Sequence, residues 1–424
     1  MSSIANPQRF LRNLFDCAVA TADPMRIVPA HLPEKPTGRV VVIGAGKASA
    51  RMAEAVESVW GPCEGLVITR YGYGRPTRGI EIVEAAHPVP DQAGFDATKR
   101  MLHLVSGLGE GDLAVALISG GASSLLVQPA GTITLTEKQA VNSEVLASGA
   151  PIGVMNVVRK HLSLVKGGQL AAAVWPARLL SLMISDVPGD DPALIGSGPT
   201  VADTSTAADA SAILEKWQVA VPASVQAALA GKSTVIAPGD PRLIDAENRV
   251  IAAPSQSLAA AADMARKSGV DVRTLGDRIE GEARDVAATQ AAMAVSIQKG
   301  LPKGSAPVLM LSGGELTVTR RGKGIGGPNA EFMLAMSIAL NGAKGIHALS
   351  CDTDGVDGAA EVAGAWINPQ TLDRARTLGL DPADHLARND SHTFFERLGD
   401  QIVPGPTLTN VNDFRAILIE ANHD

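Results

Sequence analysis

The chain has 424 residues, which is too long for one ordinary hydrophobic core, so two domains are expected. Hydrophobic residues make up 46% and charged residues 19%, a globular composition that leaves no room for long disordered segments. The formal net charge of −7 argues against nucleic acid as a partner, and the absence of any run of about 18 apolar residues argues against a membrane span.

The three cysteines, Cys17, Cys63 and Cys351, are far apart and show no CxxC spacing, so neither a zinc site nor a disulfide framework is indicated. Isolated thiols fit a reducing cytoplasm, which is the expected location. The N-terminal segment has helical periodicity interrupted by Asp16 and lacks the unbroken apolar run of a secretory signal.

After this N-terminal helix, the first half alternates strand and helix patterns. Strands are expected at residues 39–43, 65–69, 80–85, 113–118 and 179–184. Helices are expected at residues 47–60, 92–107, 136–148 and 156–174, and residues 203–235 look helical and connecting. Continuous apolar strands separated by amphipathic helices are typical of a doubly wound parallel sheet.

A proline-bearing, charged stretch at residues 238–249 is the expected boundary, which gives domains 1–237 and 238–424. The second half restarts the alternation, with strands expected at 250–253, 271–274, 307–311, 316–319 and 346–350. Its helices are expected at 255–268, 281–299 and 329–340. The expected fold is therefore α/β: a Rossmann-like doubly wound parallel sheet followed by a smaller α/β domain, with the active site in the cleft between them.

Three glycine-rich turns follow predicted strands, and the longest, at residues 311–331, is the most informative part of the chain. Dense glycines expose successive backbone N–H groups, and a helix N-terminus adds more, which suits phosphate. The residues expected to contact nucleotide or phosphate are Gly44, Gly46, Gly120, Gly121, Gly313, Gly314, Glu315, Gly324, Gly326, Gly327 and Asn329.

Lys47 follows the first of these turns, at the start of a predicted helix. The turn is not a Walker A loop, because it lacks the four residues between its glycines. It resembles half of a Rossmann fingerprint, and such a turn can also serve only to pack a helix on a sheet. A lysine in the first helical turn opposes the helix dipole, so its presence indicates an anion to be bound.

A basic segment holds Arg159, Lys160, His161 and Lys166 within eight residues. On one continuous helix, Arg159 and Lys166 would lie on the same face. A solvated basic face is one interpretation, and binding of an anionic substrate is the other. The acidic net charge of the chain favours the second.

Acidic residues follow two predicted strands: Asp186, Asp190 and Asp191 in the first half, and Asp352 and Asp354 in the second. Carboxylates at strand ends hold Mg²⁺ or accept protons, although Asx turns and helix caps use the same residues. His87 lies in a proline-rich loop after a strand, where it can face a site or simply form a rigid turn.

These motifs together resemble the bacterial and archaeal glycerate 2-kinases, whose C-terminal domain is called MOFRL and covers about residues 305–420 here. The matching stretches span nearly the whole chain in order, at residues 44–48, 86–91, 118–124, 156–163, 166–168, 185–191, 197–199, 312–315, 389–395 and 405–413. The resemblance implies ATP-dependent phosphorylation of D-glycerate at its 2-hydroxyl, with a divalent metal such as Mg²⁺. One position departs from the family pattern, because Pro328 stands where an arginine is often found.

On this interpretation Lys47, Asp186 and Asp190 are catalytic, with Lys47 at the transferring phosphoryl group. The expected substrate-binding residues are Arg159, with Lys160 as second choice, and Ser119, Ser123 and His87. Asp191, Asp352 and Asp354 are the expected metal ligands. The partners are glycerate and ATP, without nucleic acid or membrane, and the sequence leaves oligomeric state open.

Two alternatives stay open. Members of this family are often labelled hydroxypyruvate reductase, which would use NAD(P)H, but the acidic residue expected about 20 residues after the first glycine turn is absent. A non-catalytic sensor of sugar acids is the other alternative. It would need neither Lys47 nor carboxylates for a metal.

Overall fold

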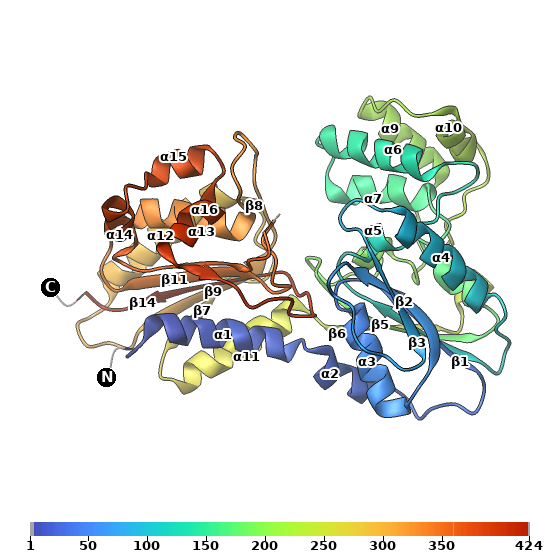
Figure 1. Ribbon diagram of the computed structural model, residues 1–424, viewed down its shortest axis with the longest axis horizontal. Helices are drawn as coiled ribbons and strands as arrows, with labels where there is room; N and C mark the ends of the chain where they lie inside the picture. The colour runs from blue at the N-terminus through green and yellow to red at the C-terminus, as the bar shows by residue number, and fades with distance from the viewer. Residues whose placement is uncertain (1–3, 359, 423–424) are drawn as a thin grey trace. The chain divides into compact units, whose positions relative to one another are not determined.

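The computed structural model describes residues 4–358 and 360–422, which form two compact units (Figure 1). The parallel-sheet unit is Pro24–Ala252. The mixed-sheet unit comprises the described residues up to Asp23 and those from Ala253 onward. Among the described residues, no helix is both long and apolar enough to cross a membrane.

Six parallel strands form the sheet of the parallel-sheet unit. They are β1 (Val40–Ala45), β2 (Glu64–Arg70), β3 (Ile80–Ala85), β4 (Leu113–Ile118), β5 (Arg178–Ile184) and β6 (Ala246–Ala252). Their order is β3-β2-β1-β4-β5-β6, which is the Rossmann order. The predicted doubly wound parallel sheet is therefore confirmed. The order reverses between β1 and β4, and ligands of such sheets bind outside the carboxyl ends of the strands at that point.

Helices cover both faces of this sheet. One face packs against α4 (Gln92–Val105) and α8 (Gln169–Val174), and their apolar side chains share a core with alternate residues of the strands. α3 (Ser49–Trp60) packs against β1, β2 and β4, together with the short α2 (Pro24–Ile27) and η1 (Val28–His31). All residues of the central strands β1 and β4 are consequently buried, as their continuous apolar runs predicted.

Four further helices form a separate cluster, here called the helical cap (Figure 1). They are α6 (Leu135–Ala147), α7 (Ile152–His161), α9 (Ala207–Lys216) and α10 (Ala223–Ala230). Short α5 (Ala122–Leu125), which follows β4, and η2 (Ile195–Ser197), which follows β5, contact each other, and η2 also contacts α7. The helical cap therefore lies over the carboxyl ends of β4 and β5.

The single helix predicted at residues 156–174 is wrong. α7 ends at His161, and α8 begins only at Gln169. Gly167 and Gly168 between them have φ of +56° and +80°, a left-handed conformation that glycine adopts without strain and that breaks a helix. Arg159 and Lys166 are therefore not on one helix face.

The mixed-sheet unit is built on a second six-stranded sheet. Its strands are β7 (Asp271–Thr274), β9 (Val308–Gly314), β11 (Ile346–Asp352), β12 (Gly364–Ile367), β13 (Gln401–Ile402) and β14 (Asp413–Ile419), in the order β13-β12-β11-β14-β9-β7. β14 is antiparallel to both β9 and β11, and only β7 pairs in parallel with β9. β8 (Gly281–Glu282) and β10 (Leu316–Thr317) form a separate two-stranded pair.

α1 (Pro7–Thr21) and α11 (Pro254–Lys267) cover one face of this second sheet, and α12 (Ala283–Gly300) and α13 (Pro328–Leu340) cover the other. The remaining elements are α14 (Thr371–Thr377), α15 (Pro382–Ala387) and α16 (Ser391–Leu398), and in the other unit η3 (Pro241–Leu243). The predicted strand at 250–253 is part of β6 and extends the first sheet, because its backbone pairs with β5. In the structure the boundary between the two units therefore lies near residue 252 rather than at 237. The N-terminal helix belongs to the mixed-sheet unit.

Candidate active site

Lys47 lies at the switch point, in the turn between β1 and α3. Its backbone N–H donates to the carbonyl oxygen of Gly120 at 2.8 Å, which joins the loop after β1 to the loop after β4. Its side chain, which is half-buried, runs past Gly121, because a Cβ added to that glycine would lie 3.4 Å from Lys47 Cγ. The same added atom would lie 3.0 Å from Cδ2 of His87. Three separate loops therefore bring Lys47, His87 and Gly121 together.

The first glycine turn uses its backbone donors within the protein. The N–H groups of Gly46 and Lys47 bond to carbonyl oxygens, and that of Ala48 donates to Ser119 Oγ at 3.0 Å. A Cβ on Gly44 would lie 2.1 Å from Leu117 O, and one on Gly46 would lie 2.1 Å from Ser119 Oγ. These two glycines allow close packing of β1 on β4, so in this conformation the packing interpretation of the turn holds.

The second glycine turn is different. Ser119 is fully buried and holds the Lys47 turn, so its predicted contact with substrate does not fit its position. The N–H groups of Gly120 and Gly121 have no acceptor among the described residues. Gly121 has φ of +84°, which suits glycine. These two backbone N–H groups are therefore available to donate hydrogen bonds to an anion at the carboxyl end of β4.

Ser123 connects this turn to the helical cap. Its hydroxyl lies 2.8 Å from Ser197 Oγ, and the Ser197 hydroxyl donates to Asn156 Oδ1 at 3.3 Å. Neither Ser197 nor Asn156 was among the predicted site residues, although both lie inside segments that the family pattern singled out. The chain of hydrogen bonds fixes α7 relative to the loops after β4 and β5.

Arg159, in the last turn of α7, is half-buried and has no carboxylate or other hydrogen-bond partner among the described residues. Burial lowers the pKa of its guanidinium. Lys160 is different, because it forms a buried ion pair with Asp203, whose pKa is lowered. Lys160 is thus neutralised within the protein, and the second choice for binding the substrate carboxylate is not supported.

Lys166 and Lys138 lie within electrostatic reach of Arg159, and Lys138 was not predicted from its sequence pattern. Both side chains are almost fully buried, with 1% and 2% of their surface exposed. Lys138 Nζ donates to Leu162 O at 2.7 Å, and Lys166 Nζ donates to Ser123 O at 2.6 Å. His161 has only serine partners, Ser205 and Ser233, and burial lowers its pKa, so the structure assigns it a structural role.

The acidic loop after β5 contains one unusual residue, Asp190. Its φ of +57° is rare for a non-glycine residue, and its Oδ1 is buried without a hydrogen-bond partner. Strained backbone and an unsatisfied carboxylate oxygen are typical of functional sites. Asp191 instead accepts the N–H of Ala193 at 2.9 Å, which is an Asx turn. Asp186 is half-buried in the same loop.

The long glycine loop of the mixed-sheet unit also uses many of its donors internally. Asn389 Oδ1 accepts the N–H groups of Arg321 and Gly322 at 2.7 and 2.9 Å, and Asp390 Oδ1 accepts that of Ile325 at 3.0 Å. A Cβ on Gly322 or Gly324 would lie 2.3 or 2.5 Å from the segment 388–390. The glycines at this loop therefore permit close packing against that segment.

The other glycines of this stretch have the same role. Added Cβ atoms would lie 2.2 Å from Ile279 O at Gly314, 2.8 Å from Asn389 O at Gly326 and 2.4 Å from Asp357 Cγ at Gly327. A Cβ added to Gly313 would lie 3.1 Å from Asp413 O. These contacts do not support the predicted phosphate cradle from Gly313, Gly314, Gly324, Gly326 and Gly327. Glu315 is exposed.

The N-terminus of α13 already donates hydrogen bonds to a carboxylate side chain of the same protein. Asp357 accepts the N–H groups of Asn329 and Ala330 at 2.9 and 2.8 Å. Asn329 is fully buried and also donates to Asp413, which pairs with buried Arg415 at 2.9 Å. The predicted phosphate contact of Asn329 is therefore wrong in this structure, because a carboxylate occupies the place expected for phosphate.

The predicted metal ligands do not gather. Asp352 Oδ1 accepts the N–H of Asp354 at 2.9 Å, and Asp354 Oδ1 accepts that of Val356 at 2.8 Å, so both shape a turn. Within residues 4–358 and 360–422, no three His, Cys, Asp or Glu side chains are grouped as metal ligands. Asp191, Asp352 and Asp354 therefore belong to no group of three protein ligands for a metal among the described residues.

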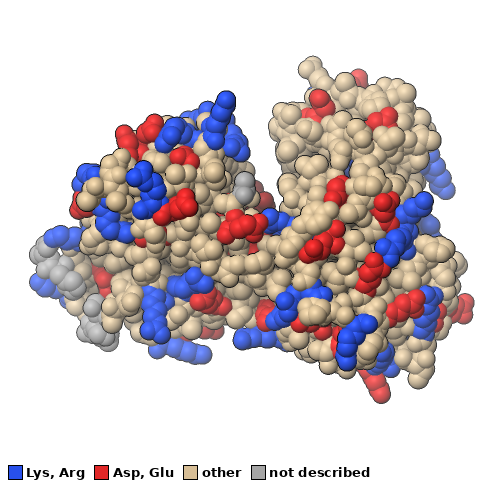
Figure 2. Space-filling model, in the orientation of Figure 1, with Lys and Arg blue, Asp and Glu red and all other residues tan. Residues whose placement is uncertain are grey.

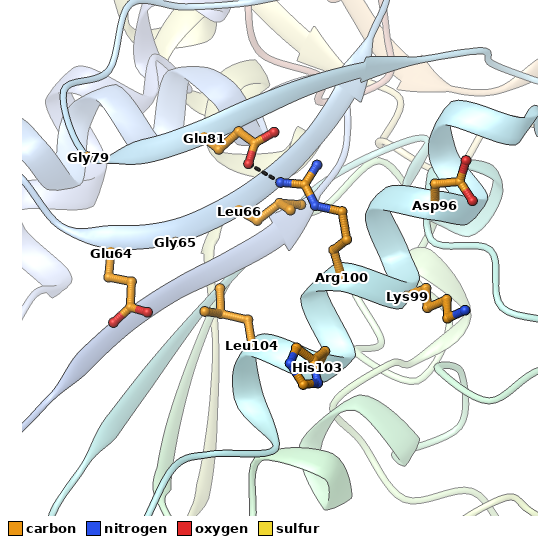
Figure 3. A pocket seen from close by; sticks show the side chains of 10 residues that line it. All are labelled: Glu64, Gly65, Leu66, Gly79, Glu81, Asp96, Lys99, Arg100, His103 and Leu104. Atoms are coloured by element: carbon orange, nitrogen blue, oxygen red, sulfur yellow. Dashed lines mark hydrogen bonds and ion pairs between the residues drawn. The ribbon is translucent and has the colours of Figure 1, made fainter.

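A groove of about 670 Å³ lies away from these loops (Figure 3). The groove is lined by residues at the starts of β2 and β3 and by residues of α4. Arg100 on α4 reaches across it and forms an ion pair with Glu81 on β3. The starts of β2 and β3 are the amino ends of the strands, opposite to Lys47 and Gly121. Over much of the face drawn in Figure 2, basic and acidic side chains are interspersed.

Similarity to known proteins covers the whole chain. The family described as a domain of unknown function, DUF4147, matches residues 10–230, and the MOFRL family matches residues 308–413. A protein of Agrobacterium vitis that carries a provisional name as a hydroxypyruvate reductase is 52% identical, covering 97% of this chain and 94% of its own length. The D-glycerate 2-kinase of Thermotoga maritima is 37% identical, covering 92% of this chain and 93% of its own.

A solved structure gives the same result. The crystal structure of a glycerate kinase from Thermotoga maritima matches with a TM-score of 0.86 at 35% identity, covering 97% of this chain and 99% of that chain. The expected family and fold class are confirmed. The chain therefore belongs to the glycerate kinase family in which a DUF4147 domain is joined to a MOFRL domain.

Proposed function

We propose that this chain transfers the γ-phosphoryl group of ATP to the 2-hydroxyl of D-glycerate, giving 2-phosphoglycerate and ADP. The observation that carries the proposal is Arg159. It is a half-buried guanidinium without a carboxylate partner among the described residues. It ends α7, the helix whose Asn156 is joined through Ser197 to Ser123 in the segment after β4. A guanidinium pairs with a carboxylate through two parallel hydrogen bonds, so a small hydroxy acid suits it.

Each remaining role follows from position. Lys47 neutralises charge on the phosphoryl group in transit, and the N–H groups of Gly120 and Gly121 add fixed dipoles beside it. Asp190 accepts the proton of the 2-hydroxyl as the new O–P bond forms and the bond from the γ-phosphorus to the bridging oxygen of ADP breaks. Its buried, unpartnered Oδ1 fits a proton acceptor.

The expected Mg²⁺ fits this arrangement only as a partner of the nucleotide. Magnesium in phosphoryl transfer contacts one or two carboxylates and takes its other ligands from phosphates and water. Asp186, in the same loop after β5 as Asp190, is the carboxylate that would meet it. Mg²⁺ would supply further neutralisation of the phosphate charge.

The second candidate is an NAD(P)H-dependent hydroxypyruvate reductase, which the provisional name of the Agrobacterium vitis relative favours. In Rossmann dehydrogenases an acidic residue at the end of the second strand binds the ribose of NAD. Here β2 ends at Arg70, followed by Tyr71. That position offers no acid for NAD, although an arginine there is compatible with NADPH.

One experiment separates the two activities. The purified chain is assayed for ADP release with D-glycerate, ATP and Mg²⁺, and in parallel for oxidation of NADH and of NADPH with hydroxypyruvate. We expect ADP release that depends on glycerate, with 2-phosphoglycerate identified as product and no oxidation of either nucleotide. Oxidation of NADPH without ADP release would establish the reductase instead, and the absence of both would favour a sensor.

A further inference from the structure

Three basic side chains lie near one another without a carboxylate partner among the described residues. They are Lys138 from α6, Arg159 from α7 and Lys166 from the segment before α8. The pKa of Lys138 is influenced by the charge of Arg159, and that of Lys166 by the charges of Lys138 and Arg159, so the three lie within electrostatic reach of one another. Among the described residues, none of the three forms an ion pair with a carboxylate.

The hydrogen bonds of the two lysines have an ordinary explanation. Lys138 donates to Leu162 O, at the C-terminal end of α7, and Lys166 donates to Leu126 O at 3.1 Å and to Ser123 O, at the end of α5. Amines placed at helix C-termini stabilise the terminal carbonyl groups. This explains why each lysine is there. It does not explain why three cations share one buried region without a carboxylate, when neighbouring Lys160 has one in Asp203.

Burial disfavours a charged amine because the charge loses its hydration, whereas a neutral amine is disfavoured much less. Burial first, and then the charge of Arg159, lowers the pKa of Lys138 to about 7. Burial, followed by the charges of Lys138 and Arg159, lowers the pKa of Lys166 well below its usual range. Both hydrogen bonds can be donated by a neutral amine, so the geometry persists in either state. A carboxylate arriving at Arg159 changes this balance in favour of the charged amines.

We propose that Lys138, Arg159 and Lys166 form one anion receptor, in which binding of the glycerate carboxylate at Arg159 draws a proton from solvent onto Lys138 or Lys166. The inference rests on the proposed substrate and extends it by making glycerate affinity dependent on pH. No bond of glycerate changes in this step: water or buffer gives up the proton, and the lysine amine accepts it. Lys138 and Lys166 are positioning residues, and Arg159 is the residue that contacts the substrate.

The other charged groups that face the receptor do not interfere with this measurement in one range of pH. Lys160 and Asp203 neutralise each other. His161 on α7 has a pKa lowered chiefly by burial, so it is neutral above pH 7. Glycerate itself stays ionised there. Between pH 7 and 9, a change in glycerate affinity therefore reports the two lysines.

Calorimetric titration of the full chain with D-glycerate tests the receptor directly. Titrations at pH 7, 8 and 9 in two buffers of different ionisation enthalpy give the number of protons taken up. By linkage, the dissociation constant should rise with pH, by roughly 2- to 10-fold per unit for an uptake of about 0.3 to 1 proton. We expect this uptake in the wild-type chain and a clear reduction in Lys138→Met.

Two further variants separate the charge effect from a structural role. Lys138→Arg keeps a permanent cation, so it should bind glycerate with little proton uptake at Lys138 and a weaker dependence on pH. Lys99→Met removes an exposed lysine on α4 and should behave as the wild type does. A lysine that only supported the fold would alter affinity by the same factor at every pH.

The outcomes also separate this inference from the proposed function. Glycerate binding without proton uptake in the wild-type chain overturns the receptor, and ADP release from the same preparation shows that the kinase proposal stands. Proton uptake on glycerate binding without any ADP release keeps the receptor and removes the kinase proposal. A folded wild-type chain that does not bind glycerate removes both.

Discussion

His87 lies directly against Gly121, so that a Cβ added to the glycine would come within 3.0 Å of the imidazole Cδ2. The loop after β3 and the loop after β4 therefore touch at Gly121, which also lies beside the Lys47 side chain. This contact makes Gly121 a position where backbone conformation and site geometry can be tested together.

Replacement of Gly121 by alanine should lower kcat/KM for glycerate by about 10-fold or more, because a displacement of about 1 Å in a site of this kind has large effects. Its φ of +84° adds roughly 1–2 kcal/mol of backbone strain. Gly72→Ala is the matched control, since its φ is +83° and an added Cβ there meets nothing within 4 Å. Steady-state kinetics and thermal unfolding of both variants check this. Equal losses of activity in the two would mean that strain alone matters.

Lys47→Ala should lower kcat by about 10²-fold or more with a smaller change in the KM for glycerate, because a cation beside the moving phosphoryl group acts mainly in the transition state. Lys99→Ala, which removes an exposed lysine of α4, serves as the control and should keep wild-type rates. An alanine variant at position 47 that retains more than about a third of the wild-type kcat would remove Lys47 from the mechanism.

Arg321 and Lys323 are exposed at the tip of the glycine loop that Asn389 and Asp390 hold in place, and neither forms an ion pair among the described residues. The family arginine is replaced by Pro328, so these cations are candidates to meet nucleotide phosphates. The double change Arg321→Gln and Lys323→Gln should raise the KM for ATP about 5-fold or more with little change in kcat. Lys267→Gln, at an exposed position on α11, is the control. An unchanged KM for ATP would exclude the tip from nucleotide binding.

Removal of divalent ions should abolish ADP release, and Mg²⁺ should restore it, because the phosphate charge cannot be neutralised by Lys47 alone. The measurement is the coupled assay after treatment with EDTA and dialysis, with Mg²⁺ added back in steps. Full turnover in reagents verified to be free of metal would contradict the role proposed for the loop that carries Asp186 and Asp190.

The stability of the chain should increase with pH between about 7 and 10 through Lys138. Its pKa is about 7 in the folded chain and about 10.4 when unfolded, so in this window the unfolded chain binds one more proton at this residue. The free energy of unfolding therefore rises with pH, by at most about 1.4 kcal/mol per unit for one lysine. Urea unfolding at pH 7, 8 and 9 should give a steeper slope for the wild type than for Lys138→Met. Parallel slopes would show that Lys138 is charged in the folded state.

Much of the parallel-sheet unit could be predicted from the sequence. A continuous apolar run marks β4 to the residue, because β4 is buried along its whole length. The limits of β3 were also predicted to the residue, although this strand contains Glu81 and Glu84 and is only partly buried. β12 to β14 were not predicted, because their pairing is antiparallel and joins segments far apart in the chain. Lys47, Arg159 and Asp190 could be proposed as site residues because their residue types are unusual at those positions, and their roles stay predictions.

What each polar group and glycine does was decided only by tertiary structure. Arg159 and Lys160 are adjacent in sequence, yet only Lys160 meets an acid, Asp203, that lies more than forty residues away. Gly46 and Gly121 look alike in sequence, but one is pressed against Ser119 and the other faces Lys47 and His87. The N-terminus of α13 attracts an anion, as the sequence indicated, but Asp357 provides it. Composition and spacing determine which groups a chain can offer, whereas burial and long-range partners determine which of them remain available to a ligand.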